Sequence, residues 1–181
     1  MLVGERMSTP AITVNEDMQI PEALNLMHTK NIRRLPVVDK KGKLVGMVSE
    51  RDLMKASPSQ ATSLSIWEMN YLLSKITVKQ LMSKEIITVT IDTPIEEAAR
   101  IMADTHISGL PVMDGDELAG IVTETDLFKT FVELLGAREK GVRVTIQVPD
   151  RPGELVRLTK AIFNKGGNII TLATFYTEEK E

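Results

Sequence analysis

Residues 46–52 read Gly-Met-Val-Ser-Glu-Arg-Asp, and residues 120–126 read Gly-Ile-Val-Thr-Glu-Thr-Asp. In both stretches an apolar run leads to a hydroxyl residue, and a carboxylate follows three residues later: Ser49 with Asp52, and Thr123 with Asp126. This spacing is typical of a capping box at the start of a helix. Taken singly, each stretch indicates only a helix N-terminus, but its occurrence twice predicts two copies of one strand-to-helix junction.

A sequence repeat extends outward from these stretches in both directions. Residues 7–8 (Met-Ser) recur as residues 82–83, an offset of 75 (82 − 7), and residues 35–37 (Leu-Pro-Val) recur at the same offset. One residue then drops out between the copies, in a segment that reads as a hairpin turn, where such a loss is tolerated. Two copies this similar must share one fold, so the repeat organises the chain.

Each copy is predicted to form a strand, a helix, two strands and a second helix. Ile12–Val14 is a short β-branched strand, and Pro21 suits the first turn of the helix that follows. Residues 35–38 and 44–48 flank a turn and should form a hairpin, with its proline at the strand entrance. A unit of roughly 50 residues buries too little surface to be stable alone, so we expect the copies to pack together by pseudo-twofold symmetry.

The segment between the copies, residues 61–76, contains an apolar stretch from Ile66 to Leu73 that we expect to be helical. Ser65 is the predicted N-cap of this helix. The stretch carries Trp67, the one tryptophan of the chain. Two interpretations stay open: Trp67 packs in the core of its own chain, or it belongs to a subunit interface, where Trp and Tyr are favoured.

Each copy resembles the CBS motif, named after cystathionine β-synthase, whose pairs form a sensory module. The resemblance covers residues 1–135, with one motif in residues 1–60 and the other in residues 77–135. It implies a mixed α+β or α/β fold of two paired β-α-β-β-α motifs. In that family the cleft between paired motifs binds adenosine-containing ligands, so the expected regulatory ligand is AMP, ADP, ATP or S-adenosylmethionine, and no cofactor is required.

The resemblance also implies roles for matching positions. Asp52 and Asp126 would accept hydrogen bonds from ribose hydroxyls, and the hydroxyl residues of the two junctions would bind ribose or phosphate beside a helix start. The backbone of residues 13–14 and 88–89 would read the adenine edge, with segments 32–36 and 107–111 around its ring. The predicted nucleotide-binding set is Thr13, Val14, Arg33, Arg34, Pro36, Ser49, Arg51, Asp52, Thr88, Val89, Ser108, Pro111, Thr123 and Asp126.

The two copies differ in charge near these positions. The first copy carries Arg33, Arg34 and Arg51, where the second has uncharged residues. Guanidinium groups bind phosphate well, so phosphates would converge on the arginine-rich copy. The alternative is that the three arginines are solvated surface residues. His106 either lines the cleft or belongs to the plain surface.

The C-terminal part has a different pattern. Residues 142–148 alternate in polarity, which predicts a half-buried strand, and a turn, a helix from about Pro152 to Asn164 and a strand from Asn168 follow. This order is similar to the first half of an ACT domain, a ferredoxin-like βαββαβ family that binds amino acids. Over residues 141–181 we therefore expect a partial ACT domain with an open strand edge. The resemblance places Asp150 and Asn168 near a ligand, and Gly153 where backbone approaches it closely.

Composition and missing motifs exclude several classes of function. A net charge of −3 gives no general attraction to nucleic acid or membranes. The chain has no cysteine and two histidines, so no metal site is expected. No apolar run is long enough to span a membrane, no signal peptide is recognised, and the expected location is the cytoplasm. Walker loops and nucleophile elbows are also missing, so we do not expect an enzyme.

The order of two CBS motifs and an ACT segment resembles bacterial acetoin-utilisation-type CBS–ACT proteins. We therefore expect a regulatory ligand-sensing protein that acts on an output protein still to be identified. The alternative is a structural dimerisation module without a bound ligand. In either case we expect a homodimer through apolar faces of the terminal helices, which include Leu53, Met54, Leu127, Phe128 and Phe131.

Overall fold

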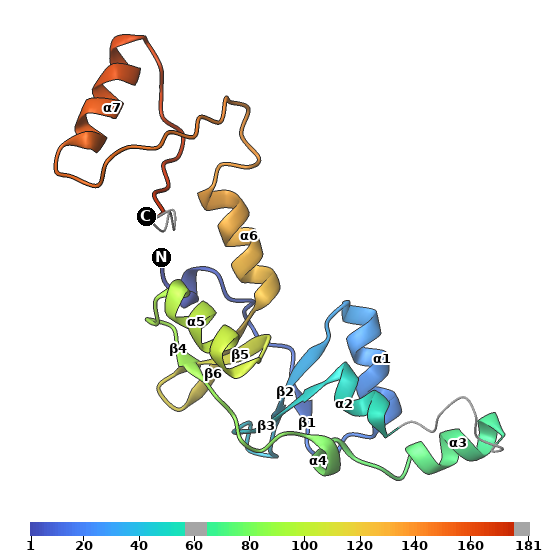
Figure 1. Cartoon of the computed structure of the whole chain (residues 1–181). Coiled ribbons are helices and arrows are strands. Elements are labelled where there is room, and N and C mark those ends of the chain that lie inside the picture. The colour runs from blue at the N-terminus through green and yellow to red at the C-terminus, as the bar shows by residue number, and fades with distance from the viewer. Residues whose placement is uncertain (57–64, 176–181) are drawn as a thin grey trace, which may run out of the picture. The chain divides into compact units, whose positions relative to one another are not determined.

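The two copies of the repeat fold alike in a computed structural model that describes residues 1–56 and 65–175 (Figure 1). The predicted mixed α+β fold class is confirmed. The first copy consists of β1 (Val14–Asn15), α1 (Ile20–Lys30), β2 (Arg34–Val38), β3 (Leu44–Ser49) and α2 (Glu50–Lys55). The second consists of β4 (Val89–Thr90), α5 (Ile95–Thr105), β5 (Gly109–Asp114), β6 (Glu117–Thr123) and α6 (Glu124–Leu134).

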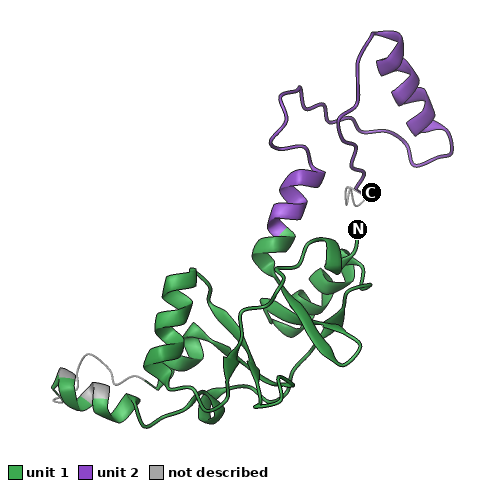
Figure 2. Cartoon of the chain, turned by 180° about the vertical axis from the view of Figure 1, so that it is seen from behind, with its two compact units in different colours: residues 1–127 green, residues 128–181 purple. Residues whose placement is uncertain are grey.

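The other described elements are helices: η1 (Val3–Glu5), α3 (Ile66–Leu73), α4 (Val78–Leu81) and α7 (Glu154–Asn164). The chain divides into two compact units, residues 1–127 and residues 128–181 (Figure 2). Both copies of the sheet lie in the first unit. None of the helices in the described residues is both long enough and apolar enough to cross a membrane.

Each copy has a three-stranded mixed sheet, in the orders β1-β2-β3 and β4-β5-β6. The first strand is parallel to the second, and the second is antiparallel to the third. The first strand starts later than predicted, because pairing begins at Val14, opposite Val37, and at Val89 in the second copy. Ile12 and Thr13 therefore precede β1.

Pro36 is the third residue of β2, which corrects its predicted place at the strand entrance. It lies opposite Met47 in β3, but the Met47 N–H donates to the Ser83 carbonyl oxygen at 3.0 Å. The missing proline N–H therefore points away from β3, on the side where β1 starts pairing only at Val37. Pro111 has the same position in β5, opposite Ile121.

The residue that the second copy lacks falls in the hairpin turn, as predicted. In the first copy the Asp39 carboxylate accepts hydrogen bonds from the N–H groups of Lys41 and Lys43, at 2.8 and 2.9 Å. In the second copy Asp114 pairs directly with Glu117, and Gly115 adopts a φ of 58° in the tighter turn. Glycine tolerates this left-handed conformation without steric cost.

The segment that precedes the first copy packs on the second copy. The Val3 N–H donates to the Thr93 carbonyl oxygen at 2.9 Å, and Ser8 pairs with Ile121 in an antiparallel bridge. Figure 1 shows the N-terminal residues beside the elements of the second copy.

The segment that precedes the second copy packs on the first in the same way. The Val78 N–H donates to the Met18 carbonyl oxygen at 2.9 Å, and Ser83 pairs with Met47. These partners are the repeat equivalents of those used by the N-terminal segment. The copies have thus exchanged their leading segments.

The exchange completes two separate hydrophobic cores. Val78 is fully buried in the first core, and Val3 is fully buried in the second. The other buried members of the first core are Val14, Ile20, Ala23, Met27, Leu35, Val37, Val48 and Leu53. Those of the second are Val89, Ile95, Ala98, Met102, Leu110, Val112 and Val122. Each core therefore depends on a residue that precedes the other copy in sequence.

Glycines in β3 and β6 make room for the exchanged segments. A β-carbon on Gly46 would lie 2.4 Å from the sulfur of Met82, and one on Gly120 would lie 2.7 Å from the sulfur of Met7. Both distances are far below the 3.5–4.0 Å of ordinary van der Waals contact. The repeated glycine is therefore a close-approach position.

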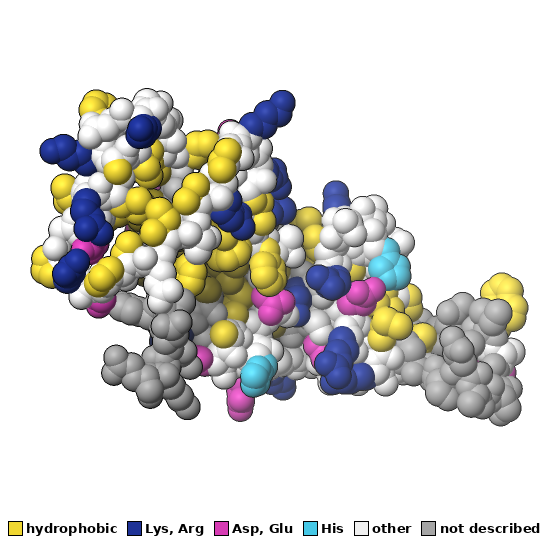
Figure 3. Space-filling view, turned by 45° about the horizontal axis from the view of Figure 1, so that its top comes forward, with side chains coloured by type: hydrophobic (Ala, Val, Ile, Leu, Met, Phe, Trp, Pro, Cys, Tyr) yellow, Lys and Arg dark blue, Asp and Glu magenta, His cyan; other side chains and the backbone are white. Residues whose placement is uncertain are grey.

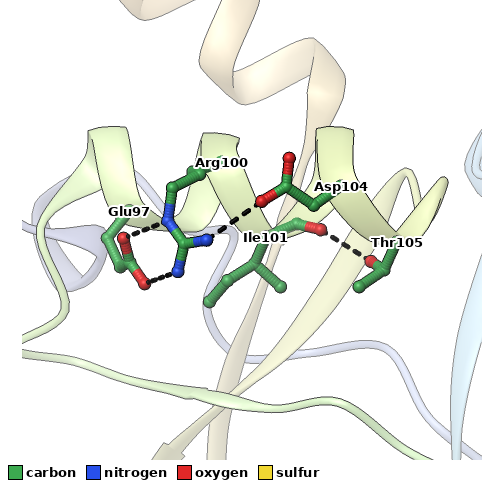
Figure 4. A network of polar contacts seen from close by, with 5 residues as sticks. All are labelled: Glu97, Arg100, Ile101, Asp104 and Thr105. Carbon is green, nitrogen blue, oxygen red and sulfur yellow. Dashed lines mark hydrogen bonds and ion pairs between the residues drawn. The ribbon is translucent and has the colours of Figure 1, made fainter.

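Helix α5 has an outer face that is polar and internally paired (Figure 4). The Arg100 guanidinium donates to Glu97 at 2.6 and 2.8 Å and to Asp104 at 2.9 Å, at the spacing of neighbours on a helix surface. One turn later the Thr105 hydroxyl donates to the Ile101 carbonyl oxygen. The helix then ends at His106, which has a φ of 56°.

The predicted helix between the copies is confirmed as α3. Ser65 caps it, because the Ser65 hydroxyl donates to Glu68 at 2.7 Å and accepts from the Glu68 N–H at 3.3 Å. Trp67 is 85% exposed, and Tyr71 is 61% exposed. The interpretation of Trp67 as a residue of the intramolecular core is therefore wrong.

The predicted apolar faces of α2 and α6 need a similar correction. Leu53 is fully buried in the first core, and Leu127 packs against the second. Met54, Phe128 and Phe131 are exposed. The leucines point inward because they lie on the face of each helix that covers its own sheet.

The second unit contains the predicted helix α7, but the predicted strands do not form in its described residues, 128–175. Residues 142–148 run without a β-ladder, and Val142 is 91% exposed. An extended segment becomes a strand only when another segment offers hydrogen-bonding partners. Figure 3 shows apolar side chains gathered on the surface of this unit; they include Val142, Val144, Ile146, Val148, Leu155, Val156, Phe163, Ile169, Ile170 and Leu172.

Candidate functional site

The two strand-to-helix junctions form the predicted capping contacts. At the start of α2 the Asp52 carboxylate accepts from the Ser49 hydroxyl at 2.5 Å and from the Ser49 N–H at 3.1 Å. The Asp52 N–H donates back to the Ser49 hydroxyl oxygen at 3.2 Å. At the start of α6 the Asp126 carboxylate accepts from the Thr123 hydroxyl at 2.7 Å and from its N–H at 2.9 Å.

Capping does not exhaust the hydrogen-bonding capacity of Asp52. Both contacts from Ser49 reach Oδ2, whereas Oδ1 lies 3.7 Å from the Lys55 ammonium nitrogen. An ionised carboxylate has about four lone-pair positions on its two oxygens. One carboxylate can therefore cap the helix and accept a further hydrogen bond from a ligand hydroxyl.

A cavity of about 220 Å³ lies beside this junction, inside the first unit. It is built from the β3–α2 junction, the chain before β4, and the chain between α5 and β5. Five predicted nucleotide-binding residues line it together: Arg34, Ser49, Asp52, Ser108 and Pro111. The cavity therefore combines the carboxylate of the first copy with the apolar segment of the second.

His106 also lines the cavity, although the residue is exposed. It is the C-cap of α5, with a left-handed backbone conformation. Sequence reasoning missed several other lining residues: Met47, Val48, Ser83, Glu85, Ile86 and Ile87. Residues 83–87 reach the site through the segment exchange, and the repeated Met-Ser pair was the signal that could have located them.

The remaining predicted residues lie elsewhere. The side chains of Val14 and Val89 are buried in the two cores, and Thr88 lines a separate cavity with Lys43 and Lys84. The residues that line neither cavity are Thr13, Arg33, Pro36, Arg51, Thr123 and Asp126. Arg33 and Arg51 are exposed, which agrees with the alternative that they are solvated surface residues.

Arg34 is the basic residue of the main cavity, and it spans both copies. It begins β2, where it pairs with Ser49, and its guanidinium donates a hydrogen bond to the Ser108 hydroxyl of the other copy. Burial lowers the pKa of Arg34, while the carboxylates of Glu124 and Asp52 act in the opposite direction. Guanidinium remains charged despite such a shift, so the cavity holds a partly desolvated cation.

The three residues assigned to an amino-acid ligand lie in the second unit. Asp150, Gly153 and Asn168 are all exposed. Gly153 precedes α7 with a φ of 91°, a conformation that favours glycine.

Family models match most of the chain. The CBS domain model matches residues 3–59 and 78–133, and a model for the TTHA0829-like ACT domain matches residues 140–181. Protein MJ1404 of Methanocaldococcus jannaschii is 35% identical over 151 residues, which cover 81% of this chain and 34% of that protein. A CBS domain-containing protein of Dictyostelium discoideum is 34% identical over 136 residues, which cover 75% of this chain and 94% of that protein. The chain thus spans about a third of the archaeal relative.

Solved structures resemble most of the chain. The CBS domain pair of protein MJ0100, in complex with 5′-methylthioadenosine and S-adenosyl-L-methionine, is 34% identical with a TM-score of 0.61 and covers 74% of this chain and 97% of its own. CBSX2 in complex with AMP is 28% identical with a TM-score of 0.62, covering 74% and 98%. A Vibrio cholerae protein assigned to acetoin utilization (AcuB) is 28% identical with a TM-score of 0.63, covering 79% and 98%.

Proposed function

Because this chain belongs to the CBS-domain family and carries a segment that matches a TTHA0829-like ACT domain, we propose that it is a regulatory protein that senses an adenosine-containing ligand. The ligand binds in the cavity between the two CBS motifs. Binding changes how the protein acts on an output partner, and the chain itself performs no catalysis.

The observation that carries this proposal is the composition of the cavity. Asp52 and Ser49 provide acceptor oxygens for ribose hydroxyls at a helix start, and Arg34 provides a cation for a phosphate. Ile87, Ile107 and other apolar residues of the lining are suited to the faces of a purine ring.

The similar solved structures support the class of ligand. One CBS pair holds 5′-methylthioadenosine and S-adenosyl-L-methionine, and another CBS protein holds AMP. These ligands share adenosine and differ in what the 5′ carbon carries. We therefore propose an adenosine ligand such as AMP, ADP, ATP or S-adenosylmethionine.

Calorimetric titration of the full chain with AMP and with S-adenosylmethionine tests this function. Asp52→Asn should weaken binding at least about tenfold, because a hydrogen bond to a charged group contributes roughly 1.5–3 kcal/mol. The amide oxygen of asparagine can still cap α2, so the fold is kept. Asp114→Asn, at the exposed end of β5, is the matched control. Unchanged affinity in Asp52→Asn would refute the assignment.

A thermal shift separates this function from a purely structural module. A ligand at 100 times its dissociation constant should stabilise the folded chain by about 2.7 kcal/mol. A scaffold without a ligand site would show no shift with any adenosine compound.

We also propose that the chain forms a homodimer. Met54, Phe128 and Phe131 leave apolar area exposed on α2 and α6, and such faces commonly pair about a twofold axis. Light scattering should give a dimer mass, and Phe131→Asp should shift it towards the monomer. A monomer mass for the unmodified chain at micromolar concentration would contradict this proposal.

For the ACT segment we propose amino-acid sensing, with Asp150 and Asn168 near the ligand and Gly153 at its backbone. The support is the match of residues 140–181. Calorimetry with each common amino acid tests this, and a heat of binding that survives Asp150→Ala and Asn168→Ala unchanged would contradict the residue assignment. The likeness to AcuB supports a role linked to acetoin utilisation.

A further inference from the structure

We propose that Arg34 is shared between the two strand-to-helix junctions, so that one chain binds one adenosine ligand with a 5′-phosphate tightly and a second such ligand much more weakly. This inference rests on the proposed adenosine binding and adds the charge of the preferred ligand and the number bound.

Arg34 starts at the first strand-to-helix junction. It lies directly opposite Ser49 in the ladder of β2 and β3. Side chains of directly opposed residues project from the same face of a sheet. Arg34 therefore leaves the sheet on the face that carries the hydroxyl of the first junction, next to Asp52 in the lining of the cavity.

The Arg34 side chain ends at the second copy. Its guanidinium donates to the Ser108 hydroxyl, and a β-carbon on Gly109 would lie 3.1 Å from its Cδ. Gly109 lies opposite Thr123, the hydroxyl residue of the second junction. The electrostatic influence of Glu124, which follows Thr123, and of Asp52 both act on the pKa of Arg34. The Arg34 guanidinium therefore interacts electrostatically with both strand-to-helix junctions.

The repeat places a glycine at the position equivalent to Arg34. Gly109 is the equivalent of Arg34, at the offset of 75 (109 − 34). A second arginine at this position would have to begin in the space that the Arg34 side chain already fills. The Arg34 side chain thus occupies the space beside Gly109, and among the described residues that line the cavity Arg34 alone is a lysine or arginine. A phosphate that takes Arg34 deprives the other junction of it.

Titration of the full chain with AMP and with adenosine tests the proposal, because the two ligands differ only in the phosphate. AMP should bind at one tight site per chain. Arg34→Gln should weaken AMP binding by roughly tenfold to hundredfold, as expected for one charge-assisted hydrogen-bonding group, and should change adenosine affinity by less than about twofold. Lys40→Gln, which removes the same charge from an exposed hairpin turn, is the control and should leave both affinities unchanged.

A transplant of the arginine gives a second, independent readout. Arg34→Gly alone should lose tight AMP binding, and the addition of Gly109→Arg should restore one tight site, because the vacated space can accept the new side chain. Two equally tight AMP sites in the unmodified chain would overturn the proposal, and so would equal losses of AMP and adenosine affinity in Arg34→Gln. Failure of both ligands to bind the unmodified chain would instead refute the proposed function, and this inference with it.

Discussion

The exchange of leading segments predicts which pairs of residues are energetically coupled. In Gly46→Ala the new methyl group would lie 2.4 Å from the sulfur of Met82 and 3.0 Å from the carbonyl oxygen of Ser83. Relief requires the Met82 side chain to move, and overpacking of this kind typically costs about 1–3 kcal/mol. Loss of glycine from the unfolded chain offsets about 0.4–1 kcal/mol, so we expect a net destabilisation of up to about 2.5 kcal/mol.

In Gly120→Ala the new methyl group would meet a backbone atom as well as a side chain. The new methyl group would lie 2.7 Å from the carbonyl oxygen of Ser8, as well as 2.7 Å from the sulfur of Met7. A carbonyl held by the bridge between Ser8 and Ile121 cannot rotate away as a methionine can. Gly120→Ala should therefore destabilise more than Gly46→Ala, and truncation of the nearby methionine should rescue it less.

Double-mutant cycles measure these couplings through urea unfolding followed by far-UV circular dichroism. Gly46→Ala with Met82→Ala should show a favourable coupling of about 1–2 kcal/mol, since the truncated side chain leaves space for the new methyl group. Gly46→Ala with Met7→Ala is the matched control, because Met7 lies against Gly120 and not against Gly46, and the two effects should add within about 0.5 kcal/mol. A coupling between Gly46 and Met7 in place of Met82 would refute the exchange.

Four further outcomes follow from the same geometry. Val3→Ala should destabilise the fold by about 2–3 kcal/mol and speed hydrogen exchange in β4–β6 more than in β1–β3, because Val3 is buried in the second core; the reverse order would contradict that placement. Trp67 should emit as a solvent-exposed tryptophan and be fully quenched by acrylamide in the monomer, so a blue-shifted, protected signal would disagree. The Ser65 hydroxyl lowers the pKa of Glu68, so Ser65→Ala should raise that pKa in an NMR titration, and an unchanged value would remove the role of the cap. Amides of residues 142–148 should exchange much faster than those of β5 and β6, because they lie in no ladder; strong protection in a monomer would disprove this.

Local features of the site could be predicted from sequence because they depend on neighbours along the chain. Ser49 and Asp52 are three residues apart, so their capping contacts follow from helix geometry. The hairpin and its shortened turn follow from the repeat and its single lost residue. The mixed α+β fold was predictable for the same reason.

Other features depend on partners that are distant in sequence. The sequence around Val3 does not indicate that this residue completes the core of the second copy. The repeat of residues 7–8 at residues 82–83 indicates only that the two leading segments pack in equivalent ways. The alternation of residues 142–148 describes their two faces but not the presence of a neighbouring strand. Likewise, the sequence distinguishes Arg34 from Gly109 but does not reveal that the two positions face each other.

The exchange of leading segments also predicts how one CBS motif would behave without the other. A chain that held residues 9–56 alone would lack the side chains of Val78 and Met82, which pack on this motif in the tandem protein. A chain that also held its own leading residues would carry a segment that fits the other motif and not its own. Two such chains could each fill the groove of the other, which is the reciprocal logic of a domain-swapped dimer. The tandem protein carries both motifs on one polypeptide, so the pairing of the two motifs does not depend on protein concentration. The two motifs can also differ in sequence, as they do at Arg34 and Gly109.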